Sequence, residues 1–445
     1  MKSTLPKVAH TVAGRSLIDW VLRAVEPLEP ASVVVVVGHG AEQVSAVLPE
    51  GVGTAVQDEQ LGTGHATSIG LAALPETDPD DTIVVLYGDL PMLTTGLLSG
   101  LATRPPEVAA RLVTVEFKDP TGYGRVVRDS EGLVTGIVEE RDTDDEQRAI
   151  SAINAGVYSF RAADLIAALG QVTNQNAQGE YYLTDVIGIL AERGERIEAV
   201  EAIPEEVVGI NSQDQLADAR RMLQTQINQR LMESGVWMLD PERTYIDDTV
   251  IVEPGARIYP GVHLEGATTV KAGARVGPDV FAVDSTIGAD STVWYAVLRG
   301  AVVGVDCEVG PYASLRPGSV LERGSKVGTF VETKNTVLRE KAKAPHLSYL
   351  GDASIGARSN IGAGTITCNY DGYEKHHTEI GEDVFVGSDT MLVAPVTIGD
   401  GAVIGAGSVI TNDVAEGALA IERNEQREIP GYSRRRAERH QEPED

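Results

Sequence analysis

Hydrophobic and polar positions follow two different patterns along the chain, and the change falls after residue 212. In the first part, apolar residues at helical spacing alternate with short, continuous apolar runs. The spacing predicts helices over residues 15–28, 41–48, 64–74 and 180–192. The apolar runs predict strands over residues 32–37, 82–87, 111–116, 133–138 and 153–160. This alternation favours an α/β fold with a mostly parallel sheet and helices on both faces.

One of these runs, SVVVVVG over residues 32–38, is apolar throughout. A run of this kind predicts a strand that is buried on both faces of the sheet. Open α/β sheets bind their ligands beyond the carboxyl ends of the strands. Polar residues that directly follow the predicted strands are therefore the first candidates for a binding site.

Residues 213–234 contain neither glycine nor proline and keep helical spacing. They predict one connecting helix that ends near Gly235. From about residue 250 a different pattern begins, so this helix separates two differently built parts.

In the second part, apolar residues recur at every sixth position. They are Val252, Ile258, Leu264, Val270 and Val276, then Val303, Val309, Leu315, Leu321 and Val327, then Ile380, Val386, Leu392, Ile398, Ile404 and Ile410. An amphipathic helix is excluded, because its apolar spacing is three and four. A period of six is typical of a parallel β-helix built from hexapeptide repeats, in which each apolar residue points into the prism.

Two segments break the period of six, at residues 334–352 and 368–379. Insertions in a solenoid loop out from one face and often form the binding site. We therefore expect both segments to be loops that carry site residues.

Composition and charge narrow the class of protein. The 445 residues are 42% hydrophobic and 23% charged, which is ordinary for a globular protein with sizeable cores. The formal net charge of −29 argues against nucleic acid or an anionic membrane as the main partner. Two cysteines, no secretory signal and no membrane-length apolar run predict a cytoplasmic protein.

Four segments together resemble one family closely. They are GYGR (122–125), GEYYLTD (179–185), HLSYLGDASIGARSNIGAGTITCNYDG (346–372) and VFVGSDTMLVAPVTIG (384–399). The family is the bacterial bifunctional N-acetylglucosamine-1-phosphate uridyltransferase and glucosamine-1-phosphate N-acetyltransferase. The resemblance extends from residue 2 to about residue 429, which is nearly the whole chain.

The resemblance implies a domain organisation and a set of partners. It implies a pyrophosphorylase domain with a Rossmann-like mixed sheet over residues 1–212 and a linker helix over 213–234. A left-handed β-helix acetyltransferase domain over 235–429 and a disordered tail over 430–445 follow. It further implies a homotrimer, Mg²⁺, acetyl-CoA and UTP as co-substrates, and UDP-N-acetylglucosamine for peptidoglycan, cell wall and cell shape as the product.

Asp89 is the first candidate of the amino-terminal part, because it lies just past a predicted strand in VVLYGDLP. On this pattern alone, a turn-forming aspartate is as consistent as a magnesium ligand. The resemblance implies that Asp89 and Asn211 hold Mg²⁺. It implies that the uridyltransferase substrates contact Lys7, Gln57, Gly62, Thr63, Tyr87, Gly88, Asp89, Gly124, Glu139, Asn154, Thr184 and Asn211.

One phosphate-binding feature of the family lies outside the printed sequence. In the family, a first strand leads into a glycine-rich loop of the type L-A-A-G-x-G-T-R-M, which cradles the triphosphate. Met1 takes the place of the final methionine of that motif, so we expect an amino-terminally truncated domain. Three alternatives stay open: a bifunctional enzyme with a late recorded start, an acetyltransferase with a crippled uridyltransferase, and a non-catalytic nucleotide-sugar-binding scaffold.

The second part carries the acetyltransferase candidates. Transfer of an acetyl group from a thioester to an amine needs a base, donors for the oxyanion and cations for the sugar phosphate. His346 can serve as base, whereas His376 and His377 are interpreted as structural or surface residues. The resemblance implies His346 as the catalytic residue, with Arg316, Lys334, Tyr349 and Asn360 at glucosamine-1-phosphate. It implies acetyl-CoA contacts at Ala363, Asn369, Tyr370, Ser388, Ala406 and Arg423.

Overall fold

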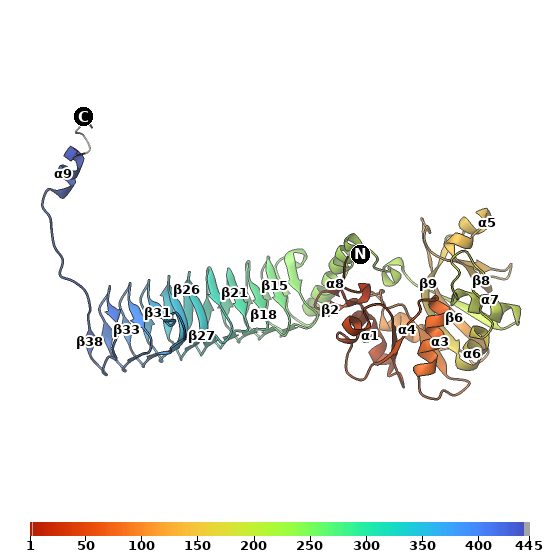
Figure 1. Cartoon of the computed structure of the whole chain (residues 1–445), viewed down its shortest axis with the longest axis horizontal. Helices are drawn as coiled ribbons and strands as arrows, with labels where there is room; N and C mark the ends of the chain where they lie inside the picture. The colour runs from red at the N-terminus through yellow and green to blue at the C-terminus, as the bar shows by residue number, and fades with distance from the viewer. Residues whose placement is uncertain (2, 440–445) are drawn as a thin grey trace. The chain divides into compact units, whose positions relative to one another are not determined.

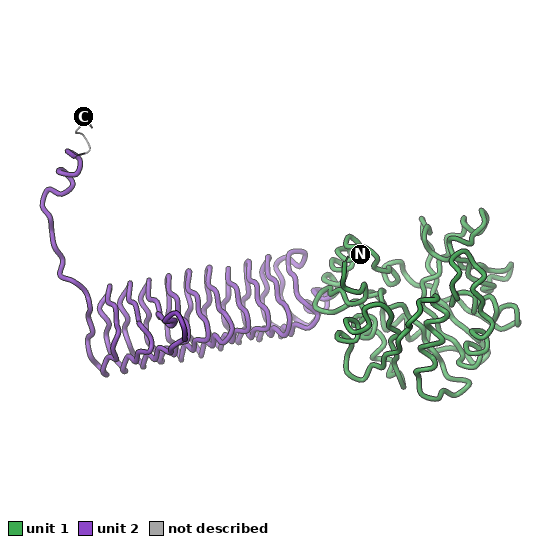
Figure 2. Tube along the Cα trace, in the orientation of Figure 1, with its two compact units in different colours: residues 1–226 green, residues 227–445 purple. Residues whose placement is uncertain are grey.

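The computed structural model describes residue 1 and residues 3–439, which form two compact units (Figures 1 and 2). Unit 1 comprises Met1–Gln226 and unit 2 comprises Ile227–Asp445. The division falls inside the predicted connecting helix, which is observed as α8 (Gln213–Glu233). The functional boundaries at residues 212, 234 and 429 stay predictions.

Unit 1 is built on a six-stranded mixed sheet. Its strands are β5 (Thr82–Val85), β6 (Val108–Glu116), β7 (Arg125–Arg128), β8 (Val134–Val138), β9 (Ala152–Arg161) and β10 (Arg196–Glu201). The order is β10-β6-β9-β7-β8, with β5 also paired to β9. The mixed sheet is confirmed, but the expectation of a mostly parallel sheet is wrong here. Only β10 and β6 run parallel, because β9 takes antiparallel partners on both of its edges.

The strand predicted over residues 32–37 forms β3 (Val34–Val37), which pairs in parallel with β4 (Gly53–Val56). These two strands form a separate small sheet. Val37 is buried, but Val34, Val35 and Val36 are only half-buried. The predicted burial on both faces is therefore wrong for three of the four residues of β3. Among the described residues, β4 is the one strand that pairs with β3.

The four predicted helices of unit 1 are confirmed, three with shorter bounds and one, α3, shifted by one residue. They are α1 (Leu17–Val25), α2 (Ala41–Ser45), α3 (Thr63–Ala73) and α7 (Thr184–Glu192). The sequence pattern missed α4 (Thr95–Ala102), α5 (Asp145–Arg148) and α6 (Ala162–Leu169), as well as β4, β7, β10 and the short hairpin β1 (Thr11–Val12) and β2 (Arg15–Ser16). Ser16 sets the start of α1, because its side chain accepts a hydrogen bond of 3.2 Å from the Asp19 amide.

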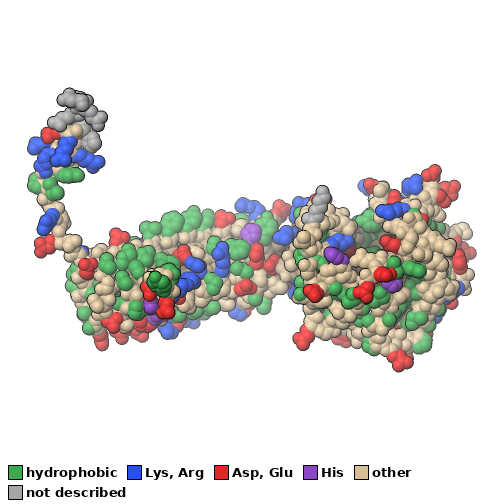
Figure 3. Space-filling view, viewed as in Figure 1, with side chains coloured by type: hydrophobic (Ala, Val, Ile, Leu, Met, Phe, Trp, Pro, Cys, Tyr) green, Lys and Arg blue, Asp and Glu red, His purple; other side chains and the backbone are tan. Residues whose placement is uncertain are grey.

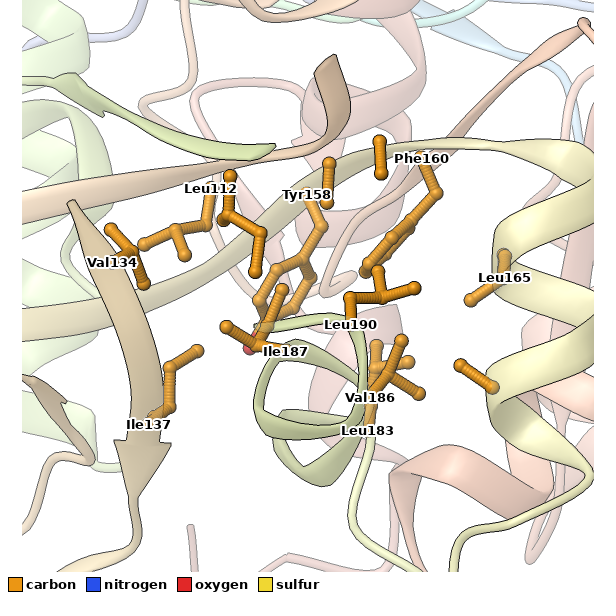
Figure 4. Close-up of a cluster of buried hydrophobic side chains, with 14 of the residues drawn as sticks. Leu112, Val134, Ile137, Tyr158, Phe160, Leu165, Leu183, Val186, Ile187 and Leu190 are labelled. Atoms are coloured by element: carbon orange, nitrogen blue, oxygen red, sulfur yellow. The ribbon is translucent and has the colours of Figure 1, made fainter. Parts of the chain in front are cut away.

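Two apolar clusters pack against the two faces of the six-stranded sheet. One contains Tyr158 and Phe160 of β9 together with residues of α6 and α7, and is drawn in Figure 4. The other contains Ile153 of β9 together with residues of α1 and α4. Successive residues of a strand point to opposite faces, so β9 contributes to both clusters. Helices thus cover both faces, as the sequence pattern predicts.

Unit 2 is a left-handed parallel β-helix, whose stacked coils are visible in Figure 1. One side is an eleven-stranded sheet: β11 (Trp237–Met238), β14 (Arg257–Ile258), β17 (Arg275–Val276), β20 (Thr292–Val293), β23 (Glu308–Val309), β26 (Lys326–Thr329), β28 (Lys343–His346), β30 (Asn360–Ile361), β33 (Phe385–Val386), β36 (Val403–Ile404) and β38 (Leu419–Ala420). Every apolar residue of the six-residue period is buried, with at most 6% of its surface exposed. The hexapeptide prediction is confirmed.

The other two sides join into a seventeen-stranded sheet. Its strands are β12 (Thr244–Ile246), β13 (Ile251–Val252), β15 (Val262–Glu265), β16 (Thr269–Val270), β18 (Phe281–Val283), β19 (Thr286–Ile287), β21 (Ala296–Arg299), β22 (Val302–Val303), β24 (Ala313–Leu315), β25 (Val320–Leu321), β27 (Glu332–Leu338), β29 (Tyr349–Ile355), β31 (Ile366–Cys368), β32 (Thr378–Ile380), β34 (Met391–Val393), β35 (Val396–Ile398) and β37 (Val409–Ile410). All of its neighbouring strands within the coils run parallel, which is the pairing of a solenoid.

The first of the two predicted insertions is wrong. Residues 334–352 remain in the coils, as β27, β28 and β29. The period is hidden because Thr333 takes an inward position, where its hydroxyl donates a 2.8 Å hydrogen bond to Ser319. Leu338 is the next buried apolar residue, after a step of five. The second insertion is confirmed: residues 369–377 loop out between β31 and β32, beside the β31 label in Figure 1.

The carboxyl-terminal segment differs from the disordered tail that the sequence predicts. Residues Tyr432–Arg439 form α9, in which every residue is exposed. Arg434 and Glu438 lie one turn apart with 3.8 Å between their charged atoms, which favours the helix. Residues 440–445 of the predicted tail lie outside the described residues.

None of the helices among residue 1 and residues 3–439 is both long enough and apolar enough to cross a membrane. α8 has the length, with 21 residues, but its sequence is rich in charged and amide side chains.

Candidate functional sites

A cation position lies at the carboxyl end of β5 in unit 1. Asp89 follows that strand, and the ammonium group of Lys7, in the 3-10 turn Lys7–Ala9, contacts its carboxylate. The same ammonium donates a 2.8 Å hydrogen bond to the amide oxygen of Asn211. The Ile210 amide donates to the Asp89 carbonyl at 3.1 Å, which holds residues 209–212 beside Asp89. Three predicted site residues thus converge on one point.

The donor set at this point fits a magnesium ion. Asp89 and Asn211 present a carboxylate and an amide oxygen to one shared cation. Mg²⁺ is typically held by one or two protein oxygens, with waters and substrate phosphates completing its shell. Among the residues that the structure describes, no group of three or more His, Cys, Asp or Glu side chains could hold a metal. Any Mg²⁺ here would therefore depend on nucleotide phosphates.

A glycine-rich turn forms the second part of this site. Gly62 has a φ of +105°, and a Cβ there would lie 2.6 Å from the Tyr181 carbonyl oxygen. Only glycine allows this approach. The Gln57 side-chain amide donates to the Gly62 carbonyl at 3.2 Å, and the Thr63 hydroxyl oxygen accepts from the Leu183 amide at 3.0 Å. The predicted residues Gln57, Gly62 and Thr63 therefore form one fixed turn at the start of α3.

Four predicted sugar contacts lie together at the third part of the site. The Thr184 hydroxyl donates a 3.1 Å hydrogen bond to the Glu139 carboxylate. A Cβ on Gly124 would lie 3.5 Å from that carboxylate and 3.6 Å from the Cβ of Asn154. Burial raises the pKa of Glu139, and Asp142 and Asp185 raise it further, while the Thr184 hydrogen bond lowers it. A carboxylate, an amide and a hydroxyl in this arrangement can hold sugar hydroxyls.

Tyr87 lies between these parts. Its ring packs against β9, where a Cβ on Gly156 would lie 2.3 Å from it, and Thr63 and Tyr158 adjoin its hydroxyl group. Burial, and then the charge of Glu139, raises the pKa of Tyr87 to about 12, so the phenol stays neutral. Gly88 packs against α1, where a Cβ would lie 2.8 Å from a methyl group of Ile18. The YGD segment therefore joins the turn, the cation position and the hydrophobic core.

Sequence reasoning missed a buried ion pair beneath the sugar cluster. Arg125 is 1% exposed, and its guanidinium lies 2.7 Å from the carboxylate of Glu140. Arg125 also donates to the Tyr123 carbonyl, which fixes the backbone on either side of Gly124. The available signal was the arginine of GYGR, but its partner is 15 residues away in the sequence.

In unit 2, strand register stacks four predicted residues at one corner of the prism. Lys343 pairs with Asn360, Asn360 with Phe385, and Phe385 with Val403 in consecutive coils. Three residues further on, the same register stacks the set that we call the base row: His346, Ala363, Ser388 and Ala406.

Backbone hydrogen bonds fix the corner that carries the base row. The Asp389 amide donates to Ala363 at 2.7 Å and the Gly407 amide to Ser388 at 2.8 Å. Arg423 extends the base row by one coil, because its guanidinium donates to the Ala406 carbonyl at 2.8 Å. The predicted base and four predicted acetyl-CoA contacts therefore follow one edge. His346 ends β28 and is exposed.

Positive charge gathers beside β29, the strand that follows His346. Arg316 lies 2.8 Å from the carboxylate of Glu332, which raises the pKa of Arg316. The neighbouring ammonium of Lys375 lowers the pKa of Lys334, and Arg316 lowers it further. Like charges this close together favour binding of an anion. Lys375 was missed by sequence reasoning, although it lies in the second predicted insertion.

Tyr349 and Asn369 lie next to these cations. Gly351 pairs with Lys334 in register, and a Cβ there would lie 2.5 Å from the Tyr349 hydroxyl and 2.8 Å from the Asn369 amide nitrogen. Asn369 donates a 2.5 Å hydrogen bond to Asp352. Burial raises the pKa of Asp352, but bonds from Asn335 and Asn369 outweigh it and lower the pKa overall.

The remaining predicted contacts lie on the loop and on the sheet of His346. Tyr370 is 61% exposed and forms a bridge with Lys375 across the loop. Asp371 accepts hydrogen bonds from three groups of that loop, including a 2.7 Å bond from His376. His376 therefore orders the loop, in keeping with its interpretation as structural. Asn360 lies in β30 and is half-buried.

Two family models match the chain. The MobA-like NTP transferase domain matches residues 1–177, and the bacterial transferase hexapeptide (six repeats) matches residues 377–412. The first match covers the part of unit 1 that contains the cation position, the glycine-rich turn and the sugar cluster, apart from Thr184 and Asn211. The second covers Ser388 and Ala406 of the base row.

Curated proteins match over nearly the full length. "Bifunctional protein GlmU" of Streptomyces avermitilis is 49% identical over 443 residues, which is 98% of this chain and 92% of that protein. The protein of the same name from Heliobacterium modesticaldum is 47% identical over 427 residues, covering 95% of this chain and 93% of its own. That of Pseudomonas entomophila is 46% identical over 437 residues, covering 98% and 95%.

Proposed function

The chain belongs to the family of bifunctional GlmU proteins, and from this premise we propose how its two units divide two reactions. The protein is a transferase with glucosamine-1-phosphate N-acetyltransferase and N-acetylglucosamine-1-phosphate uridyltransferase activity. We assign the uridyltransferase to unit 1 and the acetyltransferase to unit 2. Together, the two reactions convert glucosamine-1-phosphate into UDP-N-acetylglucosamine.

In unit 1, a phosphate oxygen of N-acetylglucosamine-1-phosphate attacks the α-phosphorus of UTP. A new P–O bond forms, the bond to the β-phosphate breaks, and pyrophosphate leaves. The protein supplies position and charge rather than a nucleophile. Glu139, Asn154 and Thr184 hold the sugar, Gln57 and the turn at Gly62 and Thr63 hold the nucleoside, and Lys7 compensates phosphate charge.

Asp89 and Asn211 would hold Mg²⁺ in this unit, at the point that Lys7 now occupies with its ammonium group. The ion would neutralise developing charge on the phosphates. The contact of a single cation with both oxygens supports this assignment, because it places two oxygen donors at one cation position.

In unit 2, the amino group of glucosamine-1-phosphate attacks the thioester carbonyl of acetyl-CoA. The C–N bond forms, the C–S bond breaks, and CoA leaves as the thiol. His346 accepts the proton of the amine, which is the work of a general base. Arg316, Lys334 and Lys375 hold the sugar phosphate, while Tyr349 and Asn360 contact the sugar. Backbone groups along the base row meet the thioester and pantetheine.

The register of the base row is the observation that carries this proposal. Five predicted functional residues, His346, Ala363, Ser388, Ala406 and Arg423, are spread over 78 positions of the sequence. They come from separate coils, yet they follow one edge of the prism. An extended cofactor such as acetyl-CoA needs contacts along a line, with the base at one end of it.

We propose that the protein is a homotrimer whose β-helices meet at the same corner. Four large side chains, which we call the apolar row, lie there in the coils before and up to His346: Tyr295, Tyr312, Phe330 and Leu347. They are 36%, 57%, 58% and 59% exposed, and apolar side chains are visible on unit 2 in Figure 3. Each has a φ between +45° and +58°, a conformation that bulky residues rarely adopt.

Both the strain and the exposure of the apolar row favour burial against another copy of the chain. Strained residues persist where the surroundings over-determine them, and exposed apolar rows mark interfaces. Since Leu347 directly follows His346, a neighbouring copy would border the acetyltransferase site. The acetyltransferase site would then lie where two copies of the chain meet, and its activity would depend on the trimer.

The substitution His346→Ala tests the proposed acetyltransferase mechanism. We expect release of the CoA thiol to fall by about 10²–10⁴-fold, the range for loss of a general base. The far-UV circular dichroism should stay unchanged, because the imidazole is exposed and ends a strand. His377→Ala is the matched control: an exposed histidine of the loop that should leave the rate unchanged. A loss of less than about tenfold in His346→Ala would remove the base role.

A further inference from the structure

Tyr158 is fully buried and has no role in the mechanism described so far. It lies in β9, and its ring packs among Leu112, Phe160 and Ile187 in the apolar cluster of Figure 4. Its ring stacks on that of Phe160 with 5.7 Å between centroids. A phenylalanine would satisfy this apolar environment, so the presence of a hydroxyl group there calls for a reason.

The hydroxyl group of Tyr158 bonds to one substrate-binding part of unit 1 and adjoins the other. The Asn154 side-chain amide donates a 2.6 Å hydrogen bond to the Tyr158 oxygen. The hydroxyl group of Tyr87 adjoins that of Tyr158 on one side and Thr63 on the other. The line Asn154–Tyr158–Tyr87–Thr63 therefore runs from the sugar cluster to the glycine-rich turn. Each of these residues except Tyr158 is already assigned to substrate binding.

The backbone of β9 is shaped to let Tyr87 reach this line. Gly156 lies between Asn154 and Tyr158 and has a φ of +73°. A Cβ there would lie 2.3 Å from the ring of Tyr87, so only glycine admits that ring. The register between β6 and β9 shifts at the same place. Bulges of this kind often lie next to active sites, where they redirect side chains.

The hydrogen bonds fix which way the Asn154 amide faces. Its nitrogen donates to Tyr158, and its oxygen accepts from the Gly156 amide at 3.3 Å. Without the Tyr158 oxygen, the nitrogen would lose its partner and the side-chain amide could rotate. A rotated amide would present the wrong donor and acceptor to a sugar.

We infer that Tyr158 is a positioning residue of the uridyltransferase site, and that its hydroxyl group orients Asn154 toward the sugar and Tyr87 toward the nucleotide. The inference rests on the proposed function, since it assumes that Asn154 binds N-acetylglucosamine-1-phosphate. It adds a residue that touches neither substrate and that links the two halves of the site. Both binding steps then depend on one buried hydroxyl group.

Tyr158→Phe tests this inference, because it removes the hydroxyl group and keeps the ring. In the full chain, we expect the KM for N-acetylglucosamine-1-phosphate to rise about tenfold, the effect of one lost hydrogen bond to a buried amide. We expect kcat to change by less than about threefold, because the phosphate groups keep their contacts. Pyrophosphate release from UTP is the measurement, and an unchanged KM would overturn the inference.

Ser159→Ala is the matched control. Its hydroxyl group is also fully buried in β9, but it donates to the Leu101 carbonyl at 2.8 Å, on the opposite face of the strand. This variant loses a buried hydrogen bond but leaves Asn154, Tyr158, Tyr87 and Thr63 unchanged. If it raised the KM as much as Tyr158→Phe does, the effect would be one of stability, and the inference would fail.

A double-mutant cycle separates positioning from a general structural role. If Tyr158 acts through Asn154, then Tyr158→Phe should change the sugar KM no further in a chain that already carries Asn154→Ala. Additive effects would overturn the inference. Acetyl transfer by unit 2 of the same protein serves as an internal control and should stay unchanged. Absence of pyrophosphate release from the unsubstituted protein would instead count against the proposed function.

Discussion

Glu139 is held in a place that is unfavourable for a carboxylate. Burial is the main cause of its raised pKa, and the neighbouring carboxylates of Asp142 and Asp185 add to it. The bond from Thr184 compensates only in part. Sites that must bind a polar ligand often keep such groups at a cost in stability. The local chemistry of Glu139 thus fits a binding role better than a structural one.

Glu139→Gln is expected to change stability in a pH-dependent way. A carboxylate with a raised pKa contributes stability that is present at low pH and lost as the pH rises through the folded-state pKa. The neutral variant avoids this loss. Its free energy of unfolding should therefore exceed that of the unsubstituted protein at pH 8 and match it near pH 4, by denaturant titration. Its KM for the sugar phosphate should rise about tenfold.

Glu198→Gln is the control, because the pKa of Glu198 is shifted in the opposite direction to that of Glu139. Hydrogen bonds from Arg111 hold the pKa of Glu198 below its usual value, so its stability contribution is present at high pH and lost on acidification. This variant should be less stable than the unsubstituted protein at pH 8. If both variants shifted in the same direction at pH 8, the electrostatic account of Glu139 would be wrong.

Individual residues differ in how far the sequence could identify them. Asp89 could be found, since its position after an apolar strand is a local signal. Arg125 and Lys375 could not, because their partners lie elsewhere in the sequence and only the fold brings them together. Tyr158 could not either, because its partner Asn154, four residues away, comes within reach only where β9 is distorted at Gly156. A family resemblance supplied the small residues of the base row, which would otherwise have been interpreted as packing positions.

Unit 2 is built from repeated coils, and the side chains at one corner of the prism change from coil to coil. The apolar row occupies one corner in four successive coils; the coils before it carry Gly261 and Asp279 there, and later coils carry Gly364, Asp389 and Gly407. Large side chains give way to small ones where acetyl-CoA is proposed to bind. The hexapeptide period predicted the prism well. It failed over residues 334–352, because steps of five and a buried threonine satisfy the same geometry.

The loop of residues 369–377 is expected to contribute a cation to the acetyltransferase site. Lys375→Ala should raise the KM for glucosamine-1-phosphate about tenfold, because one charged hydrogen bond to the phosphate is lost. The KM for acetyl-CoA should change much less. Thiol release measured against each substrate checks this.

Lys326→Ala is the matched control for the loop. Lys326 lies in unit 2 as well, where it pairs with Glu308 at 2.6 Å rather than with the site cations. It should leave both KM values unchanged. An unchanged KM for glucosamine-1-phosphate in Lys375→Ala would exclude the loop from phosphate binding.

At the scale of the whole molecule, the assembly is expected to depend on the apolar row. Phe330→Asn replaces an exposed ring with a residue that tolerates a positive φ. The coil should therefore stay folded while the contact between copies is lost. Analytical ultracentrifugation should show a shift from trimer to monomer, with unchanged circular dichroism and reduced acetyl transfer.

Ile251→Asn serves as the control for this substitution. Ile251 is 60% exposed, but it lies in β13, on the side of the prism that does not adjoin the corner of the apolar row. The Ile251→Asn protein should therefore still form a trimer. A Phe330→Asn protein that sedimented like the unsubstituted protein would contradict the proposed interface.

The two units differ in how far their folds could be predicted from the sequence. The β-helix could be predicted almost coil by coil, because one local rule repeats. Unit 1 could be predicted only in part, since its strand directions depend on long-range pairing around β9. All predicted uridyltransferase residues lie in unit 1, and all predicted acetyltransferase residues lie in unit 2. The cytoplasmic location and the role in peptidoglycan synthesis stay predictions.

If the two sites act independently and in sequence, N-acetylglucosamine-1-phosphate made by one molecule can be used by another. A complementation assay with purified His346→Ala and Asp89→Ala proteins tests it most directly. Each protein alone, given glucosamine-1-phosphate, acetyl-CoA, UTP and Mg²⁺, should form almost no UDP-N-acetylglucosamine. The mixture should form it at about half the rate of the unsubstituted protein at equal total concentration, since each reaction then has half of its sites. A mixture no more active than either protein alone would contradict the account.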